Sequence, residues 1–180
     1  MTRASSLLSE SPLYIGPIKD TPVGDLWIAV TEQGLAAVEW AKSETAFGEF
    51  LVKRFKRPVK FEPHRTAEAA AEICQYLEGQ RREFSIPIDW SLLRPFQRQV
   101  LQLTYAIPYG ETRTYGDIAA QMGKPRAARA VGRAQATNPM PLVIPCHRVV
   151  GRDGKLHGYG GGNGLPTKEW LLKMEGALIT

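Results

Sequence analysis

Residues 114–136, TYGDIAAQMGKPRAARAVGRAQA, have the pattern of two short helices joined by a tight turn. Thr114 followed three residues later by Asp117 resembles a capping box, and Gly123 is typical of the end of a helix. Pro125 suits the first turn of a second helix, which we expect to cover the alanine-rich half of the stretch. Two helices joined in this way predict a helix-turn-helix unit.

Basic residues concentrate in and around this stretch. Residues 94–133 contain seven Lys and Arg against two Asp and Glu, a net charge of +5. The whole chain of 180 residues, with 23 Lys and Arg against 18 Asp and Glu, has the same net charge of +5. Such a cluster is either a solvated helix face or a surface for the phosphate backbone of a duplex.

The second helix of the unit predicts an unusual face. At helical spacing, Ala128 and Gly132 form a row beside Arg129 and Arg133. Glycine inside a helix costs about 1 kcal/mol relative to alanine. Small residues allow another surface to approach closely. That surface is either the groove of a nucleic acid or a neighbouring helix, and the sequence leaves both open.

The first half of the chain is expected to form a small sheet and a helix. Short apolar runs separated by turn residues predict strands at residues 13–18, 26–30 and 35–40. Apolar residues at helical spacing predict a helix over 66–77, and alternation predicts a further strand over 84–88.

The second half is expected to be mainly helical. A helix is predicted from Pro95, and a last helix from Pro166 to Glu175. Turn residues at 152–155 predict a hairpin, which would form the wing of a winged helix-turn-helix domain.

Composition excludes several classes of protein. Hydrophobic residues make up 43% of the chain, which is enough for a core. Two cysteines and three histidines disfavour a disulfide scaffold and a four-ligand structural zinc site. The longest apolar runs are too short to span a membrane, and residues 1–10 lack the apolar stretch of a secretory signal. We interpret residues 1–10 as a frayed tail of a cytoplasmic protein.

Cys146 is the candidate nucleophile. It stands in the motif Ile144-Pro145-Cys146-His147-Arg148-Val149. A thiol is mostly protonated at neutral pH and needs a base, for which His147 is the candidate. Neighbouring residues point in different directions, so a water between sulfur and imidazole is expected. Glu175 is a candidate for orienting His147, whereas Cys74 fits a packing role.

The segment from Ser91 to Gly176 resembles the O6-alkylguanine-DNA alkyltransferases, or methylated-DNA–protein-cysteine methyltransferases. The motifs that carry the resemblance occur in order: Phe96 to Val100, Ile107 to Gly110, Thr114 to Gly116, Ala127 to Gly132, Asn138-Pro139, Pro145 to Val149 and Lys168 to Leu172. The resemblance implies an α/β (α+β) fold. Residues 1–90 would form an N-terminal α/β domain, ribonuclease H-like in the family, and residues 91–180 a winged helix-turn-helix domain.

The family's activity is stoichiometric DNA repair. The resemblance implies that Cys146 irreversibly accepts an alkyl group from O6 of guanine in duplex DNA after base flipping, and is then spent. O4 of thymine is a second candidate position. By the same resemblance, His147 is the base acting through water, Glu175 is its partner, and Asn138 braces the helix-turn-helix unit. Tyr115 crowds the flanking phosphate and protonates the departing guanine.

The resemblance also assigns the contacts to DNA and to the base. Arg129 would fill the space of the extruded base, and the DNA-binding set is Tyr115, Ala128, Arg129, Gly132 and Arg133. The substrate pocket would consist of Cys146, Val149, Tyr159 and Gly160. The glycine-rich segment 160–164 is longer than in many members of the family.

No cofactor and no metal are expected, because the N-terminal half offers only Cys74 and His64 where some relatives bind zinc. The expected partner is double-stranded DNA containing O6-alkylguanine, with no membrane and no obligate protein partner. We expect a cytoplasmic monomer that joins the nucleoid when bound to DNA.

Two other functions compete with alkyl transfer. A lesion-binding protein without transfer exists as a branch of the family in which the cysteine is replaced, so the presence of Cys146 disfavours it. A hydrolase using a Cys–His pair would turn over acyl or peptide substrates and would give the basic helix no role.

Overall fold

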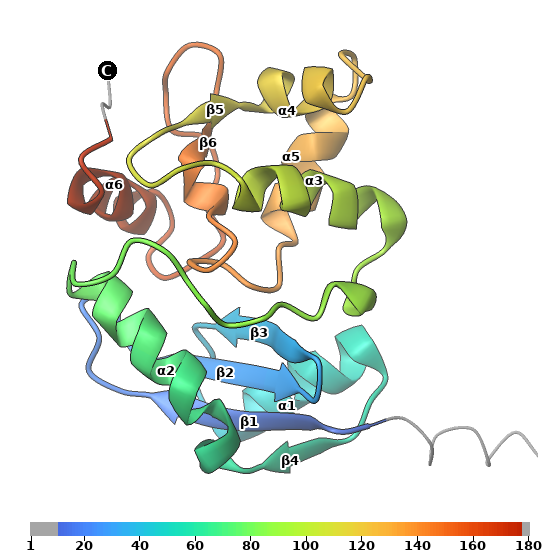
Figure 1. Ribbon diagram of the computed structural model, residues 1–180, viewed down its shortest axis with the longest axis vertical. Helices are drawn as coiled ribbons and strands as arrows, with labels where there is room; N and C mark the ends of the chain where they lie inside the picture. The colour runs from blue at the N-terminus through green and yellow to red at the C-terminus, as the bar shows by residue number, and fades with distance from the viewer. Residues whose placement is uncertain (1–10, 178–180) are drawn as a thin grey trace, which may run out of the picture.

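The computed structural model describes residues 11–177, so the predicted tail at 1–10 lies outside the described residues. A four-stranded sheet forms the first half, with strands β1 (Leu13–Ile18), β2 (Leu26–Thr31), β3 (Gly34–Glu39) and β4 (Val59–Phe61). The strand order is β3-β2-β1-β4, with β4 parallel to β1 and the other pairs antiparallel (Figure 1). The three predicted strands are confirmed, and the short β4 was not expected.

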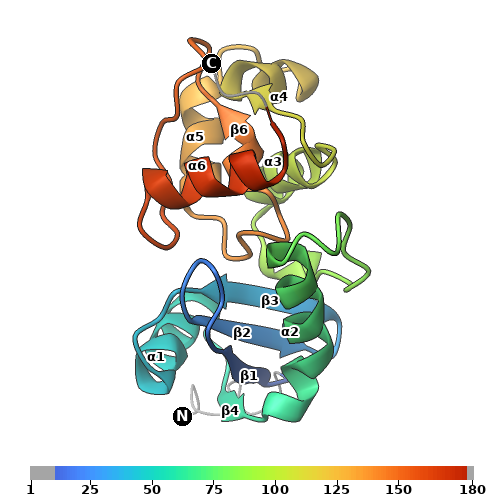
Figure 2. The same cartoon turned by 90° about the vertical axis from the view of Figure 1, so that its left-hand side faces the viewer.

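Two helices cover the two faces of this sheet (Figure 2). Helix α1 (Glu44–Phe55), which the sequence analysis did not predict, buries Phe47 and Leu51 against one face. Helix α2 (Pro63–Leu77), which contains the predicted helix 66–77, buries Ile73 and Tyr76 against the other. Alternate residues of each strand point to opposite faces, so the apolar strands supply both cores.

The second half is a helical unit. Its elements are η1 (Trp90–Leu92), α3 (Pro95–Tyr105), β5 (Arg113–Thr114), α4 (Tyr115–Gln121), α5 (Ala128–Ala136), η2 (Cys146–Arg148), β6 (Val149–Val150) and α6 (Leu165–Met174). Val100, Ile118 and Val131 form a core between α3, α4 and α5. The core on the α2 side of the sheet continues into this unit through Leu142, Ile144 and other residues, so the two halves share apolar packing.

The helix-turn-helix prediction is confirmed at its start and corrected at its second helix. The Asp117 amide donates to Thr114 Oγ1 at 3.0 Å, and the Thr114 amide donates to Asp117 Oδ2 at 2.7 Å, which completes the capping box. Helix α5 begins at Ala128, because Pro125 lies in a preceding turn closed by the Ala127 amide and the Lys124 carbonyl at 2.8 Å.

Two further predictions differ from the structure. Residues 84–88 do not form a strand; Ile88 makes a single bridge to Leu35, next to Pro87, which has no N–H for a ladder. The turn predicted at 152–155 forms through the Gly154 amide and the Gly151 carbonyl at 3.0 Å, but no returning strand follows it. Instead of a hairpin, β6 pairs in parallel with β5.

Within residues 11–177, the helices lack the combined length and apolar character that a membrane span requires.

Candidate active site

Cys146 begins the 3-10 helix η2, directly after Pro145. Residues 139–151 are all buried, so the thiol lies in a closely packed segment. Cys146 itself has 9% of its surface exposed. The sulfur therefore lies just beneath the protein surface, where packing limits its mobility.

Asn138 holds this segment from the end of α5. Its amide nitrogen donates to the Ile144 carbonyl at 2.9 Å, and its amide oxygen accepts from the Met140 amide at 2.9 Å. Burial raises the pKa of the Cys146 thiol, while the Asn138 side chain and the charge of Lys168 act in the opposite direction. Asn138 thus joins the helix-turn-helix unit to the segment that carries the thiol.

His147 is fully buried and its two ring nitrogens have different environments. Nε2 lies 2.8 Å from Glu175 Oε1, whereas Nδ1 has no hydrogen-bond partner within the described residues. Burial lowers the pKa of His147, although the Glu175 carboxylate acts to raise it. We assign a neutral imidazole whose Nε2–H donates to Glu175, because this leaves the Nδ1 lone pair free to accept a proton.

Glu175 follows α6 and is the centre of a buried polar cluster. Arg148 donates to it twice, from Nε to Oε2 and from Nη2 to Oε1, both at 2.9 Å. The hydroxyl of Tyr76 donates to Oε1, and the Gly110 amide lies 3.4 Å from Oε2. Burial raises the pKa of Glu175, but the hydrogen bonds from His147 and Arg148 outweigh burial and hold this pKa far below its usual range.

Three residues in or beside this site were missed by the sequence analysis. Tyr76 comes from α2, and its hydroxyl also lies 3.2 Å from His147 Nε2. Arg148 stands inside the cysteine motif but was given no role. Lys168 donates from Nζ to the Val149 carbonyl at 2.7 Å and the His157 carbonyl at 3.2 Å, and burial lowers its pKa to about 8. The positions of Arg148 and Lys168 in family motifs were a usable signal; Tyr76 had none.

The predicted pocket residues differ in burial. Burial raises the pKa of Tyr159 well above its usual value, with Cys146 and Glu175 adding to the shift, and the hydroxyl has no hydrogen-bond partner within residues 11–177. Its ring packs edge-on against Trp40, with centroids 6.3 Å apart. Val149 is fully buried, whereas Gly160 is exposed at the surface.

The predicted DNA-binding residues occupy the surface of α4 and α5. Tyr115, the first residue of α4, donates from its hydroxyl to the His157 carbonyl at 3.3 Å, and burial and then Cys146 raise its pKa. A Cβ at Gly132 would lie 3.8 Å from the Tyr115 ring. Arg129 and Arg133 are exposed, and Ala128 and Gly132 are partly exposed. Tyr115 therefore lies between the small-residue row of α5 and the thiol.

Within residues 11–177, no group of three or more His, Cys, Asp or Glu side chains is arranged to hold a metal ion. A buried thiol beside a neutral imidazole, behind a basic helix-turn-helix unit, defines a protein whose chemistry depends on a nucleophilic cysteine.

Comparisons with known proteins identify the family. The family model described as 6-O-methylguanine DNA methyltransferase, ribonuclease-like domain, matches residues 13–90, and the corresponding DNA binding domain model matches residues 95–177. A methylated-DNA–protein-cysteine methyltransferase of Salmonella typhimurium is 38% identical over 162 residues, which cover 88% of this chain and 94% of the relative. The constitutive enzyme of that name from Bacillus subtilis is 37% identical over 156 residues, covering 87% and 92%.

Comparison with solved structures points to the same family. The crystal structure of the O6-methylguanine methyltransferase of Mycobacterium tuberculosis superposes with a TM-score of 0.73 at 36% identity and covers 93% of each chain. The chain belongs to the methylated-DNA–protein-cysteine methyltransferase family.

Replacing Glu175 by Gln should destabilise the fold by about 3–5 kcal/mol, because Arg148 would keep a buried charge without its counter-ion. The folded-state pKa of Glu175 is depressed, so its contribution to stability is full above the unfolded value of about 4.3 and declines as pH falls below it. Urea denaturation at neutral and acidic pH measures both effects. Glu169→Gln, which breaks the exposed pair with Lys173, is the matched control, and an equal effect of both substitutions would contradict the assignment.

Replacing Tyr76 by Phe should keep the ring packing and remove a donor from Glu175, costing about 1–3 kcal/mol. A positioning role also predicts a changed pH profile for alkylation of Cys146 by free O6-alkylguanine, because His147 would lose one of the groups that fix its ring. Tyr105→Phe, at an exposed tyrosine of α3, is the control. A stability loss with an unaltered pH profile would leave Tyr76 a purely structural residue.

Proposed function

We propose that the protein repairs DNA by moving an alkyl group, in the simplest case methyl, from O6 of guanine to the sulfur of Cys146. The observation that carries this proposal is Nδ1 of His147, which has no hydrogen-bond partner within the described residues. Burial favours the neutral form of this imidazole, which stands next to the thiol in sequence, and Glu175 orients its ring. The named activity of the relatives supports it, and one of the structural neighbours, at 36% identity, is a Mycobacterium tuberculosis protein in complex with DNA.

The reaction is a displacement at the alkyl carbon. His147 accepts the thiol proton at Nδ1 through a water, and the thiolate forms the new sulfur–carbon bond. The carbon–O6 bond breaks, and its electron pair leaves with guanine, which takes up a proton. Tyr115 lies between the thiol and the DNA-facing helix and is the proposed donor of that proton. The thioether has no route back, so each molecule acts once and needs no cofactor.

The alkylated base must leave the duplex before it can reach the sulfur. Extrusion costs a few kcal/mol, less for a damaged base whose pairing is weakened. Arg129 is exposed on α5 and takes the place of the base, while Ala128 and Gly132 let the helix approach the groove and Arg133 contacts the backbone. An arginine plane can stack on bases while its charge stays close to phosphate.

Tyr159, Gly160 and the carbonyls of Cys146 and Val149 form the proposed base pocket. The Val149 carbonyl already accepts a hydrogen bond from Lys168, and a carbonyl has two lone pairs, so it can accept a second from a guanine amino group. Because Cys146 is only 9% exposed, only a small part of this residue is accessible to an extruded base.

The proposed division of the chain places the alkyl acceptor and the DNA contacts in residues 91–180 and the ribonuclease-like domain in residues 1–90. The proposed partner is duplex DNA containing O6-alkylguanine, bound by a single copy of the chain. Chromosomal DNA as substrate supports a place of action in the cytoplasm, at the nucleoid.

Incubation with a duplex containing O6-methylguanine should add the mass of one methyl group to one molecule of protein and no more. Intact-mass measurement followed by peptide mapping should place this group on Cys146. Cys74→Ser should accept methyl normally, and Cys146→Ser should bind the duplex without accepting it. Binding by the unaltered protein without adduct would favour lesion recognition alone, and repeated turnover on an ester would favour a hydrolase.

Replacing Arg129 by Ala should lower the second-order rate constant with alkylated duplex about 10-fold or more, given that extrusion costs a few kcal/mol. The reaction with the free alkylated base should slow much less, because that substrate needs no extrusion. Single-turnover kinetics with both substrates give the ratio. An equal loss on the two substrates would contradict a role in extrusion.

A further inference from the structure

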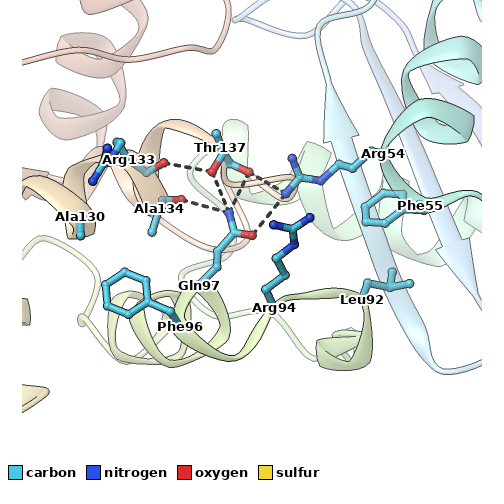
Figure 3. Close-up of a pocket in the computed structure, with 10 residues that line it drawn as sticks. All are labelled: Arg54, Phe55, Leu92, Arg94, Phe96, Gln97, Ala130, Arg133, Ala134 and Thr137. Carbon is cyan, nitrogen blue, oxygen red and sulfur yellow. Dashed lines mark hydrogen bonds between the residues drawn. The ribbon is translucent and has the colours of Figure 1, made fainter.

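A groove of about 510 Å³ lies between the two halves of the molecule, away from the thiol. Figure 3 shows that helix α1, the segment from η1 to α3, and helix α5 contribute to it. The lining residues are Arg54, Phe55, Leu92, Arg94, Phe96, Gln97, Ala130, Arg133, Ala134 and Thr137. The groove thus lies between the ribonuclease-like half and α5, the second helix of the helix-turn-helix unit.

The charge of this groove is one-sided. Three of the ten lining residues are arginines, Arg54, Arg94 and Arg133, and none is acidic. Burial and then the positive charge of Arg94 lower the pKa of Arg54, which shows that the two guanidinium groups repel each other. The charge of Glu39 acts in the opposite direction on Arg54, and Glu39 Oε1 also accepts from the Trp40 amide at 2.9 Å.

A structural role accounts for only one of these arginines. Arg54 donates from Nη2 to the Thr137 carbonyl at 2.8 Å, and Gln97 donates to the same carbonyl at 3.0 Å, so both satisfy the C-terminal end of α5. The side chains of Arg94 and Arg133 are exposed and form no hydrogen bond or ion pair with the rest of residues 11–177. The Arg94 guanidinium therefore faces that of Arg54 across the groove without a counter-charge, whereas the Arg133 guanidinium points away from this pair (Figure 3).

We propose that this groove binds a phosphate of the DNA backbone, which extends the DNA contact onto the ribonuclease-like domain. Arginine forks match the oxygens of a phosphodiester, and an anion between Arg54 and Arg94 would relieve their mutual repulsion. Arg133 lies one helical turn after Arg129 on α5, so a backbone that follows α5 past Arg129 reaches Arg133 and then the groove. This inference rests on the proposed function, because it takes α5 as the helix that meets DNA.

Replacing Arg94 by Gln tests the groove most cleanly, because its side chain makes no internal hydrogen bond. Binding of the full chain to an unmodified duplex should be measured by fluorescence anisotropy over a range of salt concentrations. Loss of one phosphate contact should reduce the slope of log K against log salt by about 0.9 and weaken binding several-fold at low salt. Arg54→Gln should act in the same direction, and the double variant should lose no more than about 0.9 of the slope in total, because both arginines serve the same phosphate.

Lys60→Gln is the matched control, since it removes one exposed charge from β4, at the far end of the ribonuclease-like half (Figure 1). It should leave the salt slope unchanged. If Arg94→Gln leaves the salt slope unchanged while the unaltered protein is methylated normally, the proposal that the groove binds a phosphate is wrong. The proposed function is then unaffected. A change in self-association without a change in slope would instead make the groove a contact between copies and would also overturn the proposal. Absence of methylation in the unaltered protein would defeat the proposed function itself.

Discussion

The carboxylate of Glu175 is the group on which the arrangement of this molecule depends. It lies in the interior, where an unpaired charge would cost several kcal/mol, and it is retained because Arg148 neutralises it with two parallel hydrogen bonds. The same carboxylate accepts from His147 and from Tyr76. One buried anion therefore ties together helix α2, the 3-10 helix of the cysteine motif and the end of α6.

The protonation state of the site follows from this anion. Carboxylate and guanidinium together carry no net charge, so an added proton on His147 would create an uncompensated charge at a fully buried ring. The imidazole is therefore neutral at rest, its Nε2–H is committed to Glu175, and Nδ1 is the nitrogen that can accept the thiol proton. Asn138 and Lys168 act on the other partner, because both favour the thiolate of Cys146 against the effect of burial.

The parts of this structure that were predictable from sequence are those fixed by neighbours along the chain. The cap of α4 depends on Thr114 and Asp117, three residues apart, and the prediction was confirmed. The contact of Tyr76 with Glu175 spans 99 residues, and no local pattern reports it. Residues 84–88 show the opposite failure: their alternation is that of a strand, but Pro87 lacks the N–H that a ladder needs. The pairing of Cys146 with His147 was visible, whereas which imidazole nitrogen stays free depends on Glu175 and required the fold.

The ribonuclease-like half does more than cover apolar surface of the other half. If it were a lid alone, the contacts across the boundary would be apolar, as they are around Leu142 and Ile144. Polar contacts cross the boundary as well. Among them, Tyr76 reaches Glu175 at the active site, and Arg54 reaches the Thr137 carbonyl at the end of α5. One contact reaches the buried cluster that contains His147, and the other reaches the end of the helix that carries Arg129. Because both contacts start from the same sheet-and-helix layer, we expect this layer to influence how α5 and Cys146 lie relative to each other, and therefore the path of an extruded base in the proposed mechanism.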